Sequence, residues 1–337
     1  MRAQLLRQPA PVDRHPLEVA DLPDPLPVDG EVLIEVEACG VCRTDLQLVE
    51  GDLTAHRLPI VPGHQIVGRV VAIGPGGDEA LVGQRVGVAW LASTCGQCRF
   101  CRSGRENLCD SARFTGWDRD GGFATLVTAR SEFVYLLPGD VQAVSAAPLL
   151  CGGAIGYRSL RIAGVGPADP DSQPGTLGLF GFGASATCAI QVARYWGWEV
   201  YVATRSEREQ DRARSLGAVW AGSYDDRVPE DLDAAVTFAP AGAVVIKALE
   251  SVRKGGTVAI NAIHLDHIPE FAYEKLWWER SLRSVANVTR ADVWELLALA
   301  VRIPIETQVE RFSLEAAGEA LLALRDGAVS GAAVLEL

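Results

Sequence analysis

Four cysteines within fifteen residues constrain this chain more than any other feature, because they place four thiols on one irregular loop. They are Cys95, Cys98, Cys101 and Cys109. Two-residue gaps let a turn wrap a single ion, and tetrahedral zinc accepts four thiolates. A redox dithiol, chance loop cysteines and an iron–sulfur cluster are the alternative interpretations. Because four cysteines leave no open coordination position, we expect a structural zinc that supports the fold.

Length and charge narrow the class of protein. The chain has 337 residues, a net charge of −12 and 48% hydrophobic residues, which suggests about two domains with large cores. It has no basic run suited to nucleic acid, no signal-like N-terminus and no apolar window of the roughly 18 residues that span a membrane. We therefore expect a cytoplasmic protein with neither nucleic-acid nor membrane partners.

The pattern of apolar residues changes along the chain. Residues 1 to about 150 contain short β patterns broken by glycine and proline, with strands expected at 31–36, 65–73 and 84–88 and few helix signals. This half is expected to form a small β barrel. After a polar break at residues 166–175, strands and helices alternate. Such alternation predicts a parallel sheet with helices on both faces.

The alternating region gives a set of expected elements. The strands are expected at 176–180, 199–203, 234–238 and 257–261, and the helices at 184–196, 207–216 and near 243–252. One more helix is expected at 291–302. The tail beyond it returns to β character and is expected to rejoin the first domain.

A glycine-rich turn follows the first of these strands. Gly181 and Gly183 precede Ala186 in a Gly-x-Gly-x-x-Ala pattern that ends a strand and opens a helix. This context predicts a dinucleotide site, with pyrophosphate at the helix N-terminus. An ordinary glycine-rich turn is the alternative. The expected contacts are Gly181, Phe182, Gly183, Ala184 and Ser185.

The next strand carries the information on cofactor choice. An NAD site usually has an acid at its end to bind the ribose 2′-hydroxyl, but Thr204, Arg205 and Ser206 stand there instead. A hydroxyl and a guanidinium suit a 2′-phosphate. NADP(H) is therefore the expected cofactor, with NAD(H) as a further possibility; the alternative is that Arg205 faces solvent.

Three further positions indicate a second zinc site, weakly when each is taken alone and strongly when they are taken together. Cys42, His64 and Cys151 would supply two thiolates and one imidazole. A lone histidine is more often a satisfied core residue, and a lone cysteine is more often a small buried side chain. Three such ligands leave a fourth position of zinc open, as catalytic zinc requires.

The segments that carry these motifs resemble zinc-containing medium-chain alcohol dehydrogenases. They are the run from Cys39 to Asp45, the Gly63-His64 pair, the four-cysteine loop and the run Leu149-Leu150-Cys151 before the glycine-rich turn. The resemblance covers essentially the whole chain. It implies an α/β protein with a GroES-like β domain at 1–152 and 290–337, and a Rossmann domain with a doubly wound parallel sheet at 153–289.

The resemblance also implies roles for individual residues. Cys42, His64 and Cys151 match the catalytic zinc ligands, Thr44 the contact to the substrate hydroxyl, and Asp45 an acid that orients the histidine. Arg43 resembles a contact to cofactor phosphate. Trp90 and Trp117 match positions that wall the substrate pocket, although either could belong to the core. Cys39 and Cys188 match no ligand and are interpreted as packing thiols.

The implied activity is reversible hydride transfer between an alcohol and NAD(P), with aldehyde reduction as the reverse reaction. A primary alcohol is expected as substrate, and a secondary alcohol is a further possibility. Two zinc ions per chain and a homo-oligomer, either dimer or tetramer, are expected. The alternatives are a polyol or other hydroxyl-compound dehydrogenase of the same fold and a non-catalytic cofactor-binding relative.

Two glutamines depart from the family pattern. Gln65 stands where the family usually has a glutamate near the zinc, and Gln47 stands where many members have a histidine that relays the alcohol proton. Neither change removes a metal ligand. Both bear on the rate and the pH dependence of the reaction.

Overall fold

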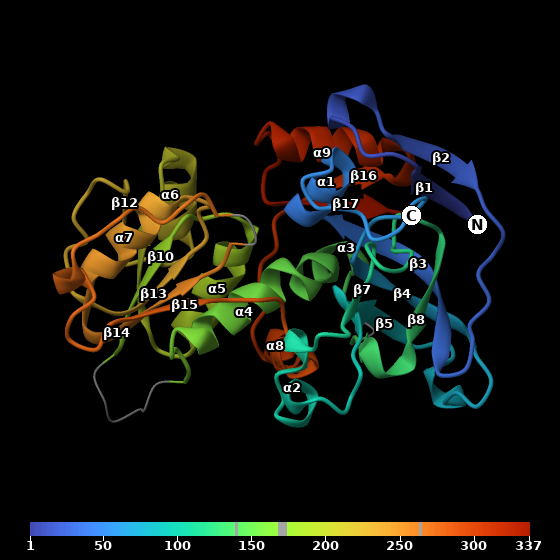
Figure 1. Ribbon diagram of the computed structural model, residues 1–337, viewed down its shortest axis with the longest axis horizontal. Coiled ribbons are helices and arrows are strands. Elements are labelled where there is room, and N and C mark those ends of the chain that lie inside the picture. The colour runs from blue at the N-terminus through green and yellow to red at the C-terminus, as the bar shows by residue number, and fades with distance from the viewer. Residues whose placement is uncertain (139–140, 168–173, 263–264) are drawn as a thin grey trace. The chain divides into compact units, whose positions relative to one another are not determined.

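The computed structural model describes residues 1–138, 141–167, 174–262 and 265–337, which form two compact units (Figure 1). The first unit comprises Met1–Cys151, Asn287–Val301 and Glu306–Leu337, and the second comprises Gly152–Ala286 and Arg302–Ile305. The structure thus divides the chain after residues 151 and 286. The boundaries expected from the sequence lie after residues 152 and 289.

A seven-stranded sheet forms the centre of the first unit, in the order β16-β17-β3-β4-β5-β9 with β8 paired to β3. Its strands are β3 (Glu31–Val41), β4 (Gln65–Ile73), β5 (Arg85–Val88), β8 (Leu126–Arg130), β9 (Val134–Leu136), β16 (Val309–Ser313) and β17 (Ala332–Glu336). β16 and β17 are parallel, and the other pairs are antiparallel. Ile34, Ile66 and Phe123 are fully buried in the core of this unit. Residues from both ends of the chain therefore build one sheet.

Shorter elements complete the described part of the first unit. The strands β1 (Arg2–Leu6) and β2 (Leu17–Asp21) pair with each other, as do β6 (Leu91–Ser93) and β7 (Arg113–Phe114). The α-helices are α1 (Arg43–Glu50), α2 (Arg99–Arg102), α3 (Ala143–Ala146), α8 (Arg290–Arg302) and α9 (Ala317–Arg325). The 3-10 turns are η1 (Val12–Arg14), η2 (Glu79–Leu81), η3 (Glu106–Leu108), η4 (Ser131–Phe133), η5 (Ala147–Leu150) and η7 (Leu314–Ala316).

Helix α9 corrects the expectation that the tail has β character alone. Ala317, Ala320 and Leu321 are buried at the i, i+3, i+4 spacing of an amphipathic helix. Alanine and leucine are also strong helix formers. The tail is therefore a strand, a helix and a strand, with α9 between β16 and β17.

Six parallel strands form the sheet of the second unit, in the order β12-β11-β10-β13-β14-β15. They are β10 (Thr176–Phe180), β11 (Glu199–Ala203), β12 (Trp220–Gly222), β13 (Leu232–Thr237), β14 (Val252–Ile260) and β15 (Ser281–Ser284). The helices are α4 (Gly152–Ile162), α5 (Ala184–Tyr195), α6 (Glu207–Ser215) and α7 (Gly242–Ser251), with the 3-10 turn η6 (Tyr273–Lys275). The strand order reverses at β10, and ligands bind at such a switch point in doubly wound sheets. The predicted α/β fold with a Rossmann sheet is confirmed.

Most predicted elements of the second unit agree with the structure, and one differs. β14 begins at Val252 rather than at residue 257, because the chain passes directly from α7 into the strand. The pairing with β13 shifts register there, next to Gly255 with φ +79°. The predicted polar break at 166–175 contains residues 168–173, which lie outside the described residues.

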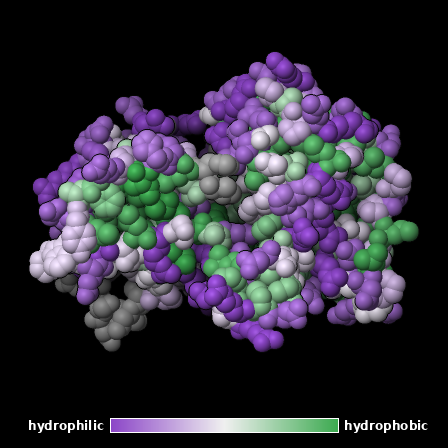
Figure 2. Space-filling view, in the orientation of Figure 1, coloured by the Kyte–Doolittle hydropathy of each residue, from purple (hydrophilic) through white to green (hydrophobic). Residues whose placement is uncertain are grey.

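The surface is mainly polar on the face shown in Figure 2, where apolar residues occupy separate patches. Exposed large apolar side chains of the second unit include Tyr273, Trp277 and Trp278. Among the described residues, no helix has the length and apolar character needed to cross a bilayer.

Candidate metal centres and cofactor site

Three side chains from separate segments of the first unit meet at one point. Cys42 follows β3, His64 precedes β4, and Cys151 follows η5. Their ligand atoms all lie within 4.8 Å of one another. The Sγ atom of Cys42 is 3.4 Å from Nε2 of His64. The structure thus brings together the three residues that are weak clues separately.

Asp45 holds two members of this triad in place. Its Oδ2 accepts a hydrogen bond from the Cys42 backbone N–H at 2.9 Å. Its Oδ1 lies 3.0 Å from His64 Nδ1 and accepts from the Gly63 N–H at 3.2 Å. Cys42 and Asp45 also form the capping box that starts α1. Because a carboxylate favours the proton on Nδ1, the neutral His64 ring presents the lone pair of Nε2 toward Cys42.

Mutual contacts shift the pKa values of the triad. A hydrogen bond from Cys151 lowers the pKa of Cys42, with help from the charge of His64 and against burial. The same hydrogen bond, together with burial, raises the pKa of Cys151. Burial favours a neutral His64, but the charges of Asp45 and Cys42 outweigh burial and raise its pKa. Buried groups with this excess of negative charge suit a cation, which would neutralise them.

The donor set and its spacing fit zinc with one open position. Zinc–sulfur and zinc–nitrogen distances of about 2.3 and 2.0 Å place the two donor atoms about 3.5 Å apart in a tetrahedron. The measured separation between Cys42 Sγ and His64 Nε2 is 3.4 Å. Three protein ligands leave the fourth position for water or substrate.

Other predicted residues lie on the elements that carry the triad. Thr44 is 9% exposed on the first turn of α1, and its N–H donates to Cys42 Sγ at 3.4 Å. Arg43 precedes it and is exposed, whereas Gln47 is half-buried one turn further along. Gln65 is buried and fills the space beside Gly40, where a Cβ would lie 2.8 Å from the Gln65 Cδ. A side chain at residue 40 would therefore displace the Gln65 side chain.

An aromatic group adjoins the triad. The Trp90 ring lies 6.0 Å from the His64 ring. Trp117 lies 5.9 Å from Trp90 at an interplanar angle of 20°, and Phe114 packs against both indoles. His56 stacks on Trp117 at 3.9 Å. The sequence analysis missed Phe114 and His56, because no spacing pattern relates either residue to the metal ligands.

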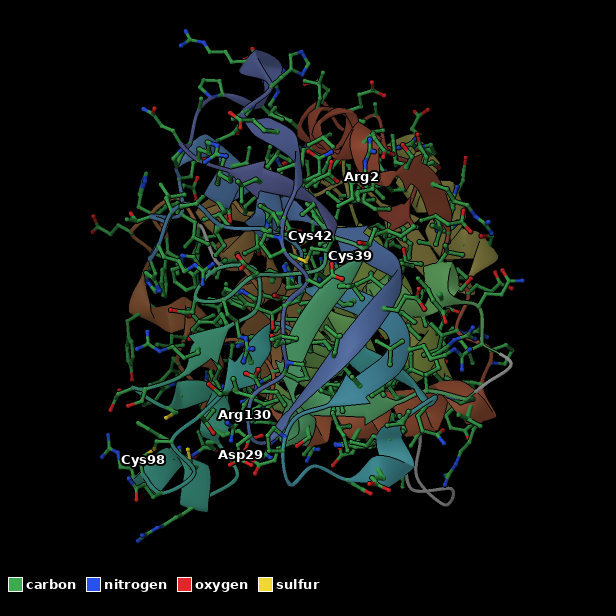
Figure 3. All side chains as sticks on the ribbon, turned by 90° about the vertical axis from the view of Figure 1, so that its right-hand side faces the viewer. Arg2, Asp29, Cys39, Cys42, Cys98 and Arg130 are labelled. Carbon is green, nitrogen blue, oxygen red and sulfur yellow. The ribbon has the colours of Figure 1, made fainter. Side chains whose placement is uncertain are left out.

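The four-cysteine loop forms a second candidate metal site, and Figure 3 shows Cys98 well apart from Cys42. The sulfur–sulfur distances are 3.5 Å for Cys98–Cys101, 3.5 Å for Cys95–Cys109 and 3.9 Å for Cys95–Cys101. A zinc ion at about 2.3 Å from four sulfurs gives edges of about 3.8 Å. The loop is therefore shaped for a closed tetrahedral site.

Backbone N–H groups prepare this loop for thiolates. Hydrogen bonds from the N–H groups of Gln97 and Cys98 lower the pKa of Cys95 to about 6. Burial raises the pKa of Cys109 to about 11. The Cys98 thiol also caps α2 by accepting from the Cys101 N–H at 3.5 Å. The short gaps between these cysteines thus direct N–H groups at sulfur.

Glu106, within η3, joins this loop to α8. Its carboxylate accepts hydrogen bonds from Arg290, from the backbone N–H at 2.9 Å, from Nε at 3.0 Å and from Nη2 at 2.8 Å. Burial opposes the charge of Glu106, but these hydrogen bonds prevail and lower its pKa. The sequence analysis identified neither residue, since they lie 184 positions apart.

The glycine-rich turn lies between β10 and α5. Gly181 has φ +95°, and a Cβ there would lie 2.9 Å from the Ala239 backbone nitrogen, so only glycine fits. Gly183 is the N-cap of α5, and nothing lies within 4 Å of where its Cβ would be. The backbone is therefore open to a ligand at the helix start, as a pyrophosphate site requires. Of the other turn residues, Phe182 and Ala186 are buried, and Ala184 and Ser185 are half-buried.

The three residues after β11 differ in exposure and in partners. Thr204 is 2% exposed, and its hydroxyl donates to the Glu209 carboxylate. Ser206 caps α6 by accepting from the Glu209 N–H at 3.4 Å. Arg205 is exposed. The Thr204 hydroxyl proton is thus already used within the protein, whereas the guanidinium faces outward.

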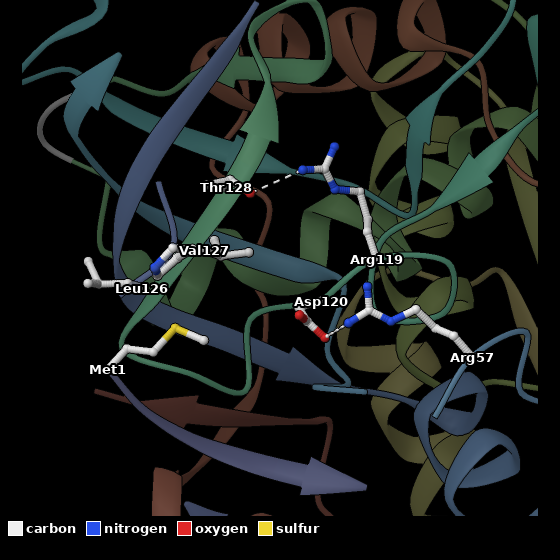
Figure 4. Close-up of a pocket in the computed structure, with 8 residues that line it drawn as sticks. Met1, Arg57, Arg119, Asp120, Leu126, Val127 and Thr128 are labelled. Carbon is white, nitrogen blue, oxygen red and sulfur yellow. Dashed lines mark hydrogen bonds and ion pairs between the residues drawn. The ribbon is translucent and has the colours of Figure 1, made fainter. Parts of the chain in front are cut away.

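A cavity of about 140 Å³ lies elsewhere in the first unit (Figure 4). Its lining includes Arg57 and Arg119 and none of the predicted site residues. Arg57 pairs with Asp120 at 2.8 Å, and Arg119 pairs with Glu31 at 2.7 Å. Because each guanidinium has a carboxylate partner, this cavity presents no uncompensated charge to a ligand.

Comparison with known proteins covers both units. The family model for the alcohol dehydrogenase GroES-like domain matches residues 28–139, and the model for zinc-binding dehydrogenases matches residues 186–302. A Mycobacterium tuberculosis protein, probable alcohol dehydrogenase AdhA, is 45% identical over 341 residues. That match covers 99% of this chain and 97% of the relative.

Solved structures show the same fold. The acetophenone reductase from Geotrichum candidum in complex with NAD is 26% identical, with a TM-score of 0.85 over 100% of this chain and 97% of that one. The CAD from Helicobacter pylori complexed with NADP(H) is 21% identical, with a TM-score of 0.86 over 100% of this chain and 99% of that one. The first of these neighbours thus holds NAD and the second NADP(H).

Proposed function

Because the chain belongs to the zinc-dependent medium-chain alcohol dehydrogenases, we propose that it interconverts alcohols and aldehydes with Cys42, His64 and Cys151 as the catalytic zinc site. The triad carries this proposal, because two thiols and one imidazole leave a coordination position for a substrate oxygen. A non-catalytic relative has no need of such a site. A polyol dehydrogenase would need polar groups beside the triad, where this chain has Trp90 and Phe114.

The protein's own side chains have distinct tasks in this reaction. When bound, zinc supplies a Lewis acid for the substrate oxygen, and the nicotinamide supplies the hydride donor or acceptor. The Thr44 hydroxyl accepts a hydrogen bond from the substrate alcohol and would relay its proton, giving up its own hydroxyl proton as it receives that of the alcohol. Trp90 and Trp117 exclude water and hold an apolar substrate chain. Gln47 cannot accept a proton at accessible pH, so the proton leaves Thr44 by another route.

We propose two zinc ions per chain and NADP(H) as the preferred cofactor, with NAD(H) also used. The four-cysteine loop supports the second zinc, because its sulfur–sulfur distances suit a closed tetrahedron. The exposed Arg205 supports NADP(H), because β11 is followed by a threonine rather than an acid. Arg43, exposed at the start of α1, is the proposed further contact to cofactor phosphate.

Metal analysis combined with turnover tests the catalytic assignment. Cys151→Ala should reduce the zinc content from two ions per chain to one and abolish turnover with primary alcohols, while leaving the fold intact. The matched control is Cys188→Ala, which removes a buried thiol from the second unit, where burial raises its pKa to about 12. The control should keep both zinc ions and its turnover. A wild-type chain that holds iron, or turnover by Cys151→Ala, would refute the assignment.

We also propose a cytoplasmic homo-oligomer, a dimer or a tetramer, that acts on small-molecule alcohols and aldehydes. The rings of Tyr273, Trp277 and Trp278 are exposed and lie next to one another in the second unit, which favours burial against another subunit. None of the eight cysteines forms a disulfide, which suits a reducing compartment. Light scattering on the purified protein measures the number of subunits in the oligomer.

A further inference from the structure

The end of β11 is the position that meets the adenosine ribose in a doubly wound sheet. Thr204 occupies it, and this residue is committed to the protein on all sides. Its N–H donates to the Gly222 carbonyl at 2.9 Å, and its carbonyl accepts from Gln210 Nε2 at 2.9 Å. Its hydroxyl donates to Glu209. A bound cofactor would therefore contact the groups around Thr204 rather than its hydroxyl, which is already hydrogen-bonded within the protein.

Glu209 departs from the usual geometry of its position in α6. It is the N3 residue behind the N-cap Ser206, and a glutamate at N3 commonly bonds back to the N-cap N–H. The Glu209 carboxylate instead reaches the Thr204 hydroxyl through Oε2. Within the described part of the chain, its Oε1 accepts no hydrogen bond. A carboxylate oxygen is thus available beside the strand end although the residue that follows the strand, Thr204, is not an acid.

The surroundings of Tyr224 indicate that two opposite charges act near the Thr204 hydroxyl, at the end of β11. The pKa of its half-buried phenol is raised first by burial. The Thr204 hydroxyl lowers it, and the charges of Glu209 and Arg205 then shift it in opposite directions. A ligand group placed here would feel the same two charges.

The geometry points to Glu209 as a cofactor-specificity residue that opposes Arg205. Its carboxylate, brought to the end of β11 by the first turn of α6, accepts a hydrogen bond from the ribose 2′-hydroxyl of NAD(H) and repels the 2′-phosphate of NADP(H). Arg205 attracts that phosphate. The choice between the two cofactors is then the difference between two neighbouring charges, an inference that rests on the proposed dehydrogenase function.

Binding of cofactor fragments tests Glu209 without involving the metal. Dissociation constants for 2′,5′-ADP and 5′-AMP are measured by titration calorimetry at low salt, and those for NADPH and NADH by fluorescence. Within each pair, Glu209→Gln should shift the ratio of the two dissociation constants by roughly 10–100-fold in favour of the ligand that carries the 2′-phosphate. Each ratio compares two ligands on one variant, so a partly unfolded preparation does not affect it.

Glu207→Gln is the matched control, because it removes the same charge from the same turn of α6 at an exposed position. Its ratio should change by less than about 2-fold. Equal shifts in the two variants, or no shift in Glu209→Gln, would overturn the role of Glu209. If Arg205→Ala leaves the ratio unchanged, the proposed NADP(H) preference through Arg205 is wrong. That result does not bear on Glu209, which Glu209→Gln tests separately. A wild-type chain that binds neither cofactor would overturn both the proposed function and this inference.

Discussion

Replacing Asp45 by asparagine asks how far the catalytic metal site depends on a carboxylate that is not one of its three ligands. Asp45 uses both of its oxygens as acceptors, Oδ2 from Cys42 and Oδ1 from His64 and Gly63. Asparagine has the same shape but only one acceptor oxygen. If that oxygen faces His64, the amide –NH2 opposes the Cys42 N–H. If it faces Cys42, the –NH2 opposes Nδ1 and favours a proton on Nε2, the atom directed at Cys42.

Either orientation has a cost that can be worked out. One lost hydrogen bond to a charged group costs about 1.5–3 kcal/mol. Removing the outer partner of a metal-binding histidine typically lowers metal affinity or activity by ~10–100-fold, which corresponds to about 1.4–2.7 kcal/mol. We therefore expect Asp45→Asn to weaken the catalytic metal by ~10–100-fold and to lower kcat/KM, with no effect on the four-cysteine site.

The assay is the release of zinc to a coloured chelator over time, together with kcat/KM. The matched control is Asp118→Asn, because the Asp118 side chain is equally buried at 4% exposure and bonds His56 at 2.8 Å and the Phe114 N–H at 2.8 Å. It touches no member of the triad. If zinc leaves Asp45→Asn and Asp118→Asn at the same rate, the reasoning about Asp45 is wrong.

Three further predictions concern stability and proton release. Glu106→Gln should lower stability by about 1–2 kcal/mol at neutral pH. Because Arg290 lowers the pKa of Glu106, this contribution is present above the unfolded-state pKa of about 4.3 and is lost as the pH falls through the lower folded-state value. The Tm difference from wild type should shrink below that pH, and a constant difference would contradict the ion pair. Cys98→Ala should remove one zinc and lower the Tm sharply, because a structural zinc contributes folding free energy; an unchanged Tm would count against a structural role. Gln47→His should add a titration near ~6.5 to the pH–rate profile of alcohol oxidation and raise the neutral rate by well under ~10²-fold. An identical profile would show that proton release does not limit the reaction.

The elements of the second unit follow closely from the sequence, because the spacing of apolar residues within each segment indicates a strand or a helix. β10 and β11 begin and end at the predicted residues, since short apolar runs are bounded there by breaks. The first unit gave weaker local signals. α1 starts at a cysteine cap rather than at serine, threonine, aspartate or asparagine, so its beginning carried no usual helix-start residue. β3 runs on to Val41, well past its predicted end at residue 36.

The two clusters of candidate metal ligands could be predicted, because few residue types bind zinc and their spacing is distinctive. Asp45 also lies three residues from Cys42 on one helix turn, so its contact is local. The contacts of Glu106 with Arg290, and of His56 with Trp117, join elements that only tertiary packing brings together. No local pattern encodes such proximity, and the resemblance to the family did not extend to these residues.

The pairing of β3 with β17 bears on the order in which the two proposed metal sites are completed during synthesis. Gly40 and Val41, just before Cys42, pair with Val334 and Ala333. Until those late residues leave the ribosome, one edge at this end of β3 is open, whereas its other edge pairs with β4 through Gly40 and Gln65, the residue next to His64. The four-cysteine loop lies within a single short stretch and needs no such partner for its thiols to meet. In a nascent chain the four-cysteine loop would therefore be complete before Cys151 is made, and the sheet edge beside the triad would be covered only after the whole second unit has been made.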